Sequence, residues 1–183
     1  MKRTPPHYIV YGVHGVLLRV HGLGVLLTGP SGIGKSVLAL ELLARGHALV
    51  ADDAVEIRRG ATGRLTGQAP PLLRGFIEVR GLGILDVRRL YGKSAVRARQ
   101  GLDLIIRLTR GHGRPTAAAR LAGRRSTQRL LNEKVPVLSL CAGLGDNLPV
   151  LVEAASLDQR LRLAGFAADQ VFAQRQQKAI KQK

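Results

Sequence analysis

The stretch Gly29-Pro30-Ser31-Gly32-Ile33-Gly34-Lys35-Ser36 matches the pattern G-x-x-x-x-G-K-[S/T] at every position. Its glycines let the backbone turn closely enough for successive N–H groups to face phosphate oxygens. Lys35 supplies a positive charge for the outer phosphates, and the Ser36 hydroxyl can ligate Mg²⁺. The stretch therefore predicts a site for nucleotide phosphates at residues 29–36. The pattern does not determine what happens to those phosphates.

The segments on either side of this loop have the patterns that a phosphate-binding loop requires. Residues 25–28 form an apolar strand candidate directly before it. After it, Leu38, Leu42 and Leu43 recur at helical spacing, and an Arg-Gly pair at 45–46 marks the expected end of the helix. A chance match in a chain with 22 glycines is the alternative, and these flanks argue against it.

Further segments complete the predicted fold. Strands are expected at residues 16–18, 48–51, 55–57, 64–66 and 104–108, and a late helix at 151–163, whereas the Arg-, Gly- and Ala-rich residues 110–129 receive no assignment. Hairpin candidates beside a strand–loop–helix unit predict an α/β fold, in which a mixed β-sheet is flanked by helices. This P-loop domain is expected to span residues 1–172, followed by a basic tail at 173–183 that frays.

Composition limits the partners that the chain can be expected to have. Its 29 basic and 12 acidic residues give a net charge of +17, which favours polyanions or serves only solubility. Aromatic residues make up 3% of the chain and no recognition motif accompanies the charge, so we expect no nucleic-acid binding. The apolar segment at 13–28 is too short and too polar to span a bilayer, and the single Cys141 fits a reducing compartment. We therefore expect a cytoplasmic protein without a membrane partner.

Three carboxylates and one histidine are candidates for the chemistry of the site. Asp52 and Asp53 follow the predicted strand at 48–51, and open α/β sheets place their ligands at the carboxyl ends of strands. Two adjacent carboxylates there are costly unless a cation or a proton compensates them. In isolation a turn or helix-cap pair is the more common role, and the P-loop reverses that preference. Glu78 stays undecided, and a lone histidine such as His14 is more often structural than catalytic.

Four segments occur in an order that resembles a known enzyme family. They are residues 14–16 (His-Gly-Val), 28–36 (the loop and the preceding threonine), 45–53 (Arg-Gly-His-Ala-Leu-Val-Ala-Asp-Asp) and 77–86 (Ile-Glu-Val-Arg-Gly-Leu-Gly-Ile-Leu-Asp). Together they resemble the catalytic domain of bacterial HPr kinase/phosphorylase, and the likeness runs from about His7 to Phe172. That family acts on a seryl hydroxyl of HPr, the phosphocarrier of the sugar phosphotransferase system. The Arg-Gly-Leu-Gly-Ile segment is its most specific part.

The resemblance implies a role for each candidate residue. ATP would be bound by Gly29, Pro30, Ser31, Gly32, Ile33, Gly34, Lys35 and Ser36, Mg²⁺ would be held by Ser36 and Glu78, and the catalytic residues would be His14, Lys35, Asp52, Asp53 and Arg120. Asp53 would take the proton of the attacking serine, and Asp52 would support the metal or the base. Arg120 matches the family's Asp-Arg-Leu-Gly stretch only loosely. HPr would be the partner, and the chain would form a homo-oligomer, namely a hexamer, as relatives do.

Three departures from the family pattern qualify these expectations. Because His14 falls almost at the start of this sequence, we expect the N-terminal domain of the usual two-domain form to be absent, and Pro30 stands where the family often has Asp. The stretch 137–147 lacks both arginines of a Val-Arg-Pro-Gly-Arg-Asn-like segment linked to phosphorolysis, so kinase activity is expected to survive better than phosphorylase activity. Two alternatives stay open, namely a nucleotide-binding regulatory module with little turnover and a kinase for another hydroxyl acceptor.

Overall fold

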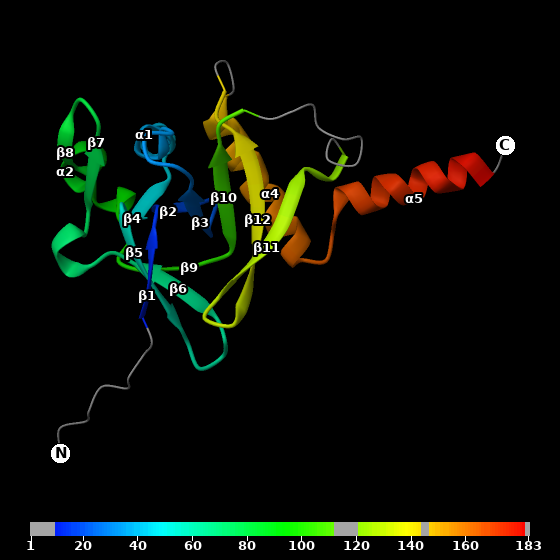
Figure 1. Cartoon of the computed structure of the whole chain (residues 1–183), viewed down its shortest axis with the longest axis horizontal. Helices are drawn as coiled ribbons and strands as arrows, with labels where there is room; N and C mark the ends of the chain where they lie inside the picture. The colour runs from blue at the N-terminus through cyan, green and yellow to red at the C-terminus, as the bar shows by residue number, and fades with distance from the viewer. Residues whose placement is uncertain (1–9, 112–120, 144–146, 182–183) are drawn as a thin grey trace.

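The structure is a computed structural model and describes residues 10–111, 121–143 and 147–181. A six-stranded mixed sheet forms its centre (Figure 1). In spatial order its strands are β11 (Arg124–Leu130), β12 (Glu133–Cys141), β10 (Leu104–Thr109), β3 (Leu23–Thr28), β2 (Val16–Val20) and β4 (Ala48–Ala51). The neighbours β3, β10 and β12 run parallel, whereas β2 pairs antiparallel with both β3 and β4. Strands β3 and β4 therefore point the same way and end on the same side of the sheet.

Two smaller sheets lie beside the central one. The first has the order β1 (Val10–His14), β5 (Ala54–Arg59), β6 (Leu65–Gln68) and β9 (Gln100–Gly101). The second is a hairpin of β7 (Phe76–Val79) and β8 (Gly83–Asp86), which lies next to the phosphate-loop helix in Figure 1. Between β1 and β2 the chain passes from the four-stranded sheet into the central sheet. Between β4 and β5 it returns to the four-stranded sheet.

Helices α1 (Lys35–Ala44) and α4 (Leu148–Leu163) cover one face of the central sheet, and the four-stranded sheet covers the other. The described chain also has helices α2 (Val87–Tyr91) and α5 (Ala168–Lys181), and single 3₁₀ turns at Pro71–Leu73 and Lys93–Ala95. Leu27 and Ile106 pack with α1 and α4, while the neighbouring Leu26 and Ile105 pack with β5 and β6. All four side chains are fully buried, because successive residues of a strand face opposite sides.

Most of the predicted elements are confirmed, including the α/β fold with a mixed sheet. The hairpin at 55–57 and 64–66, the strand at 104–108 and the helix at 151–163 correspond to β5 with β6, β10 and α4. The unassigned region 110–129 contains a strand, β11, which pairs with β12 along its whole length.

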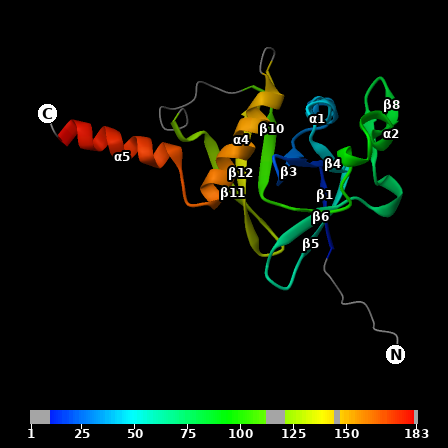
Figure 2. The same ribbon diagram turned by 180° about the vertical axis from the view of Figure 1, so that it is seen from behind.

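The expected basic tail begins within a helix, and its fraying stays a prediction. Residues 173–181 continue α5, and the expected boundary after residue 172 falls inside that helix. The segment is rich in Ala, Gln, Lys and Arg, which are good helix formers even without burial, and none of its side chains is buried. Figure 2 shows α5 extending away from the sheets. None of the described helices is both long and apolar enough to cross a membrane.

Candidate active site

The phosphate loop connects the carboxyl end of β3 to the first turn of α1. Gly29, Gly32 and Gly34 have φ values of 142°, 73° and 99°, a region that residues with a Cβ rarely adopt. Gly34 precedes the first residue of α1 and its carbonyl accepts the Leu38 N–H at 2.9 Å, so the helix starts directly from the loop. The unpaired N–H groups of this first turn make the position suitable for an anion.

Lys35 has its ammonium group inside the loop. The residue is 9% exposed, and its Nζ donates to the carbonyl oxygens of Gly29 at 3.0 Å and Pro30 at 3.2 Å. The charge is therefore fixed between the loop and the start of the helix. Pro30 contributes no N–H, but its carbonyl helps to hold this lysine.

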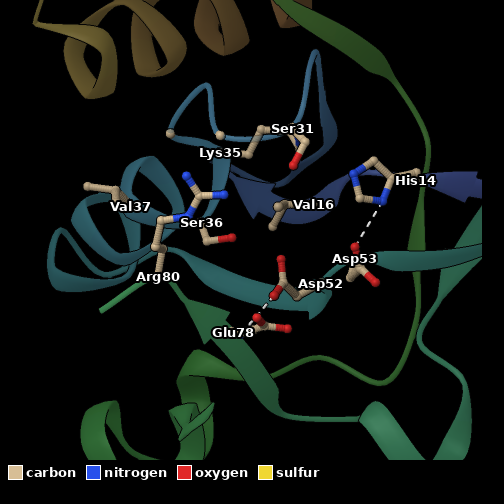
Figure 3. A pocket seen from close by; sticks show the side chains of 12 residues that line it. His14, Val16, Ser31, Lys35, Ser36, Val37, Asp52, Asp53, Glu78 and Arg80 are labelled. Carbon is tan, nitrogen blue, oxygen red and sulfur yellow. Dashed lines mark hydrogen bonds and ion pairs between the residues drawn. The ribbon is translucent and has the colours of Figure 1, made fainter. Parts of the chain in front are cut away.

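A cavity of about 400 Å³ opens in front of the loop (Figure 3). It is lined by His14, Val16, Ser31, Gly32, Gly34, Lys35, Ser36, Val37, Asp52, Asp53, Glu78 and Arg80. Of the eight loop residues, Gly29 and Pro30 instead line a neighbouring cavity of about 540 Å³, and Ile33 packs against the hydrophobic core. The structure thus brings together the phosphate loop and four of the five predicted catalytic residues. The fifth, Arg120, lies outside the described residues.

Two chain crossings between the sheets position the histidine and the aspartates. One is at His14 and Gly15, between β1 and β2, and the other is at Asp52 and Asp53, between β4 and β5. The Gly15 N–H donates to the Asp53 carbonyl at 3.2 Å, which joins the crossings. A Cβ at Gly15 would lie 2.5 Å from the Leu27 carbonyl oxygen, so only glycine fits between the crossing and β3.

Asp53 occupies the centre of a tight turn with an uncommon backbone conformation. Its φ is 62°, and the Ala54 N–H donates to the Asp52 carbonyl at 2.7 Å across it. A three-residue turn with positive φ is the rare and strained form of the γ-turn, and such strain is concentrated at functional sites. Asp53 Oδ1 lies 2.9 Å from His14 Nδ1, as the dashed line in Figure 3 shows. The two side chains are 66% and 59% exposed, so an incoming group can reach them.

Asp52 has a different environment from its neighbour. It is 6% exposed, and its Oδ2 accepts the Glu78 backbone N–H at 2.9 Å, which attaches β7 to the end of β4. Burial raises the pKa of the Asp52 carboxyl, and the negative charges of Asp53 and Glu78 also raise it, although hydrogen bonds from the backbone oppose them. Asp52 therefore belongs to a crowded acidic group that a cation would stabilise in its ionised form.

The donor atoms of the cavity fit a magnesium ion. Mg²⁺ prefers oxygen ligands, usually one or two carboxylates together with phosphate oxygens. The Ser36 hydroxyl and the carboxylates of Asp52 and Glu78 line the same cavity, and Figure 3 shows them facing a common space. The role of Glu78 could not be decided from the alternating pattern of its strand. In the structure it is exposed on β7 and lines this cavity. It reaches the cavity because the hydrogen bond to Asp52 holds β7 beside the end of β4.

Two arginines near the loop received no role from the sequence. Arg80 lines the cavity, and Arg110 Nη2 donates to the Ser31 carbonyl at 3.3 Å. A Cβ at Gly32 would lie 3.4 Å from Arg80 Nη1 and 3.8 Å from Arg110 Nη2, so both guanidinium groups are close to the loop. Arg80 stands two residues after Glu78, and Arg110 follows β10, which is parallel to β3. Their positions after these strands were a signal, and Arg80 also begins the Arg-Gly-Leu-Gly-Ile segment that is specific to the family.

Comparison with known proteins gives a consistent result. The sequence model of the HPr Serine kinase C-terminal domain family matches residues 10–176. The HPr kinase/phosphorylase of Bordetella petrii is 49% identical over 170 residues, which cover 93% of this chain and 55% of that protein. The protein of the same name from Nitrosomonas europaea is 48% identical over 163 residues, covering 88% and 50%. The chain thus spans about half the length of the curated relatives it matches.

A solved structure agrees with the fold. The Hpr(Ser) kinase/phosphatase of Coxiella burnetii superposes with a TM-score of 0.80 at 33% sequence identity, covering 88% of this chain and 98% of that chain. The similarity therefore includes the central sheet and the elements that carry the loop. Because the family match extends over residues 10–176, and a relative's solved chain is covered almost completely, this chain belongs to the HPr Serine kinase C-terminal domain family.

Proposed function

We propose that this chain is an ATP-dependent serine kinase that transfers the γ-phosphoryl group of ATP to a seryl residue of HPr. The observation that carries the proposal is the convergence of the phosphate loop, Asp52, Asp53 and Glu78 on one cavity. The names of the relatives support HPr as the acceptor. The chemistry would use the deep part of the cavity for the polyphosphate and its exposed rim for the acceptor.

Asp53 would act as the general base. The serine oxygen attacks the γ-phosphorus, the bond between that phosphorus and the bridging oxygen of ADP breaks, and the serine proton moves to the Asp53 carboxylate. His14 would orient that carboxylate through the 2.9 Å contact to Oδ1. Because Asp53 is exposed at the rim, a serine presented by a folded partner protein can approach it.

The other residues would bind and neutralise the phosphates. A bound magnesium ion would supply positive charge that offsets the charge of the phosphates. Ser36 and Glu78 would hold this ion, and Asp52 would fix the backbone of Glu78 by the hydrogen bond described above. Lys35 and Arg80 would face the charge that develops on the transferred group.

The reverse, phosphate-dependent reaction is proposed to be weaker than the forward one. Residues 137–147 contain no arginine, and inorganic phosphate as an attacking group needs cationic guides. Phosphorylated HPr would be incubated with excess inorganic phosphate, and pyrophosphate would be measured beside the forward rate. Efficient pyrophosphate release would contradict this part of the proposal.

The forward reaction is tested with purified HPr, Mg²⁺ and ATP labelled in the γ-phosphate. We expect one phosphoryl group on one serine, identified by mass spectrometry, and no label on HPr in which that serine is replaced by alanine. Transfer to a different protein would indicate another acceptor. Nucleotide binding without transfer to any acceptor would indicate a regulatory module instead.

Assembly into a hexamer stays a prediction, which light scattering of the purified chain would test.

A further inference from the structure

A second group of metal-binding residue types lies at the other end of the central sheet. His21 stands in the turn between β2 and β3, His47 precedes β4, and Glu153 lies on α4. Each offers one nitrogen or oxygen atom, and these three atoms all lie within 4.8 Å of one another. Strand β3 runs from this group to the phosphate loop, and β4 runs from it to Asp52. With about 3.4 Å per residue, the six residues of β3 separate the two sites by roughly 17–20 Å.

Hydrogen bonds from Arg45 and a contact with His47 orient the carboxylate of Glu153. Its Oε2 accepts hydrogen bonds from Arg45 Nε at 3.0 Å and Nη2 at 2.6 Å, while its Oε1 lies 2.9 Å from His47 Nε2. The side chain of His47 is 7% exposed and that of Glu153 is 16% exposed. One carboxylate oxygen is thus fixed by an arginine, and the other faces the histidines. Metal-ligating carboxylates are commonly held in this way by a hydrogen-bond donor on their second oxygen.

We propose that His21, His47 and Glu153 form a binding site for a divalent transition metal of the zinc class. Two imidazoles and one carboxylate are a donor set that binds zinc in proteins, with a water molecule as the fourth ligand. Imidazole ligands favour zinc over magnesium. The ion would displace the hydrogen bond between His47 and Glu153, and a small movement of His21 would bring its ring within bonding distance.

A simple ion-pair network accounts for only part of this arrangement. Arg45, Glu153 and His47 satisfy one another without His21. The rings of His21 and His47 lie 4.9 Å apart at an angle of 80°. At this distance the two imidazole rings can share one cation. The metal would connect the starts of β3 and β4 to α4, and so brace the elements whose other ends carry the active site.

The turn that holds His21 provides a variant that should fold. Val20 pairs with Leu23, so His21 and Gly22 form a two-residue loop, and their φ values are 46° and 90°. Positive φ at both positions defines a type I′ turn, for which Asn-Gly is the preferred pair. His21→Asn therefore removes the imidazole while suiting the backbone better than histidine does.

The test is a titration of the purified chain with ZnCl₂ in the presence of excess Mg²⁺, which occupies the carboxylate and hydroxyl site of the phosphate loop. Thermal unfolding and calorimetry report binding, and Co²⁺ used in place of zinc gives visible absorption bands of a four-coordinate ion. We expect one equivalent of zinc to raise Tm in the unmodified chain. In His21→Asn the zinc affinity should fall about tenfold or more. His14→Asn, which removes the imidazole of the other histidine–carboxylate pair, serves as the matched control and should keep the response.

Three results would overturn the proposal. They are the absence of a zinc-dependent rise in Tm in the unmodified chain, an undiminished rise in His21→Asn, and an equal loss in both variants. The readouts do not depend on phosphoryl transfer, so failure of the metal site and failure of the proposed kinase activity are distinguishable.

Discussion

Replacement of Asp53 by asparagine separates the proposed chemistry from the fold. The amide cannot accept the proton of an attacking hydroxyl, so the rate of phosphoryl transfer should fall about 10²–10⁴-fold. The contact that is lost, 2.9 Å to His14 with both side chains more than half exposed, contributes only ~0–1 kcal/mol to stability. Asparagine also tolerates the φ of 62° at this position. We therefore expect Tm to change by less than about 4 °C.

A second substitution at the same position shows the cost of the backbone conformation. Asp53→Ala removes the same carboxylate but places an ordinary residue at φ 62°, which costs roughly 1–2 kcal/mol. Both variants should lose transfer activity to a similar extent, and only the alanine variant should unfold at a clearly lower temperature.

The assay measures labelled phosphate on HPr under saturating Mg²⁺ and ATP, with nucleotide affinity determined separately by calorimetry. Retention of more than about one-tenth of the activity by Asp53→Asn would refute the role of general base. A large loss of nucleotide affinity would show that Asp53 acts in binding instead.

Three further changes test other parts of the structure. Gly15→Ala places a Cβ 2.5 Å from the Leu27 carbonyl oxygen, and should lower the free energy of unfolding by about 1–3 kcal/mol in urea titrations. The Arg45 hydrogen bond lowers the pKa of the Glu153 carboxyl from its ordinary 4.5 to about 2. The ionised carboxylate therefore stabilises the fold at neutral pH, and this stabilisation is lost as the pH falls from 4.5 to about 2. The stability of Glu153→Gln, measured by acid titration, should lack this pH dependence. Because burial raises the pKa of Asp52, its ionised form costs stability at neutral pH, and Asp52→Asn should leave the nucleotide-free protein at least as stable while reducing the rise in Tm that Mg·ATP produces.

Local sequence patterns were sufficient for the phosphate loop and the elements around it. The apolar run before Gly29, the helical spacing of the leucines after Ser36 and the acidic pair after β4 are each determined within a few residues. Backbone geometry limits how such segments can be arranged. The loop and the two aspartates were expected at the carboxyl ends of strands, and they follow β3 and β4, which end on the same side of the sheet.

The rest of the site depends on contacts between distant segments. His14 meets Asp53 only because β1 pairs with β5 in a separate sheet and both crossings adjoin at Gly15. No local pattern encodes that pairing. The positions of Arg80 and Arg110 likewise depend on how β7 and β10 lie against the loop. The helix α5 was not expected, because its sequence is polar and none of its residues is buried against the rest of the described chain.

The convergence of Ser36 and Glu78 on one nucleotide-bound metal ion is the central claim, and Mn²⁺ binding measured by electron paramagnetic resonance tests it most directly. The titration uses a non-hydrolysable ATP analogue with the unmodified chain and with Glu78→Gln. The control is Glu133→Gln, which removes a carboxylate on β12 that forms an ion pair with Arg59. If Glu78 holds the ion, Glu78→Gln should bind Mn²⁺ in the presence of the analogue about tenfold or more weakly. Its affinity for the analogue without metal should be unchanged. Equal Mn²⁺ affinity in all three proteins would contradict the claim.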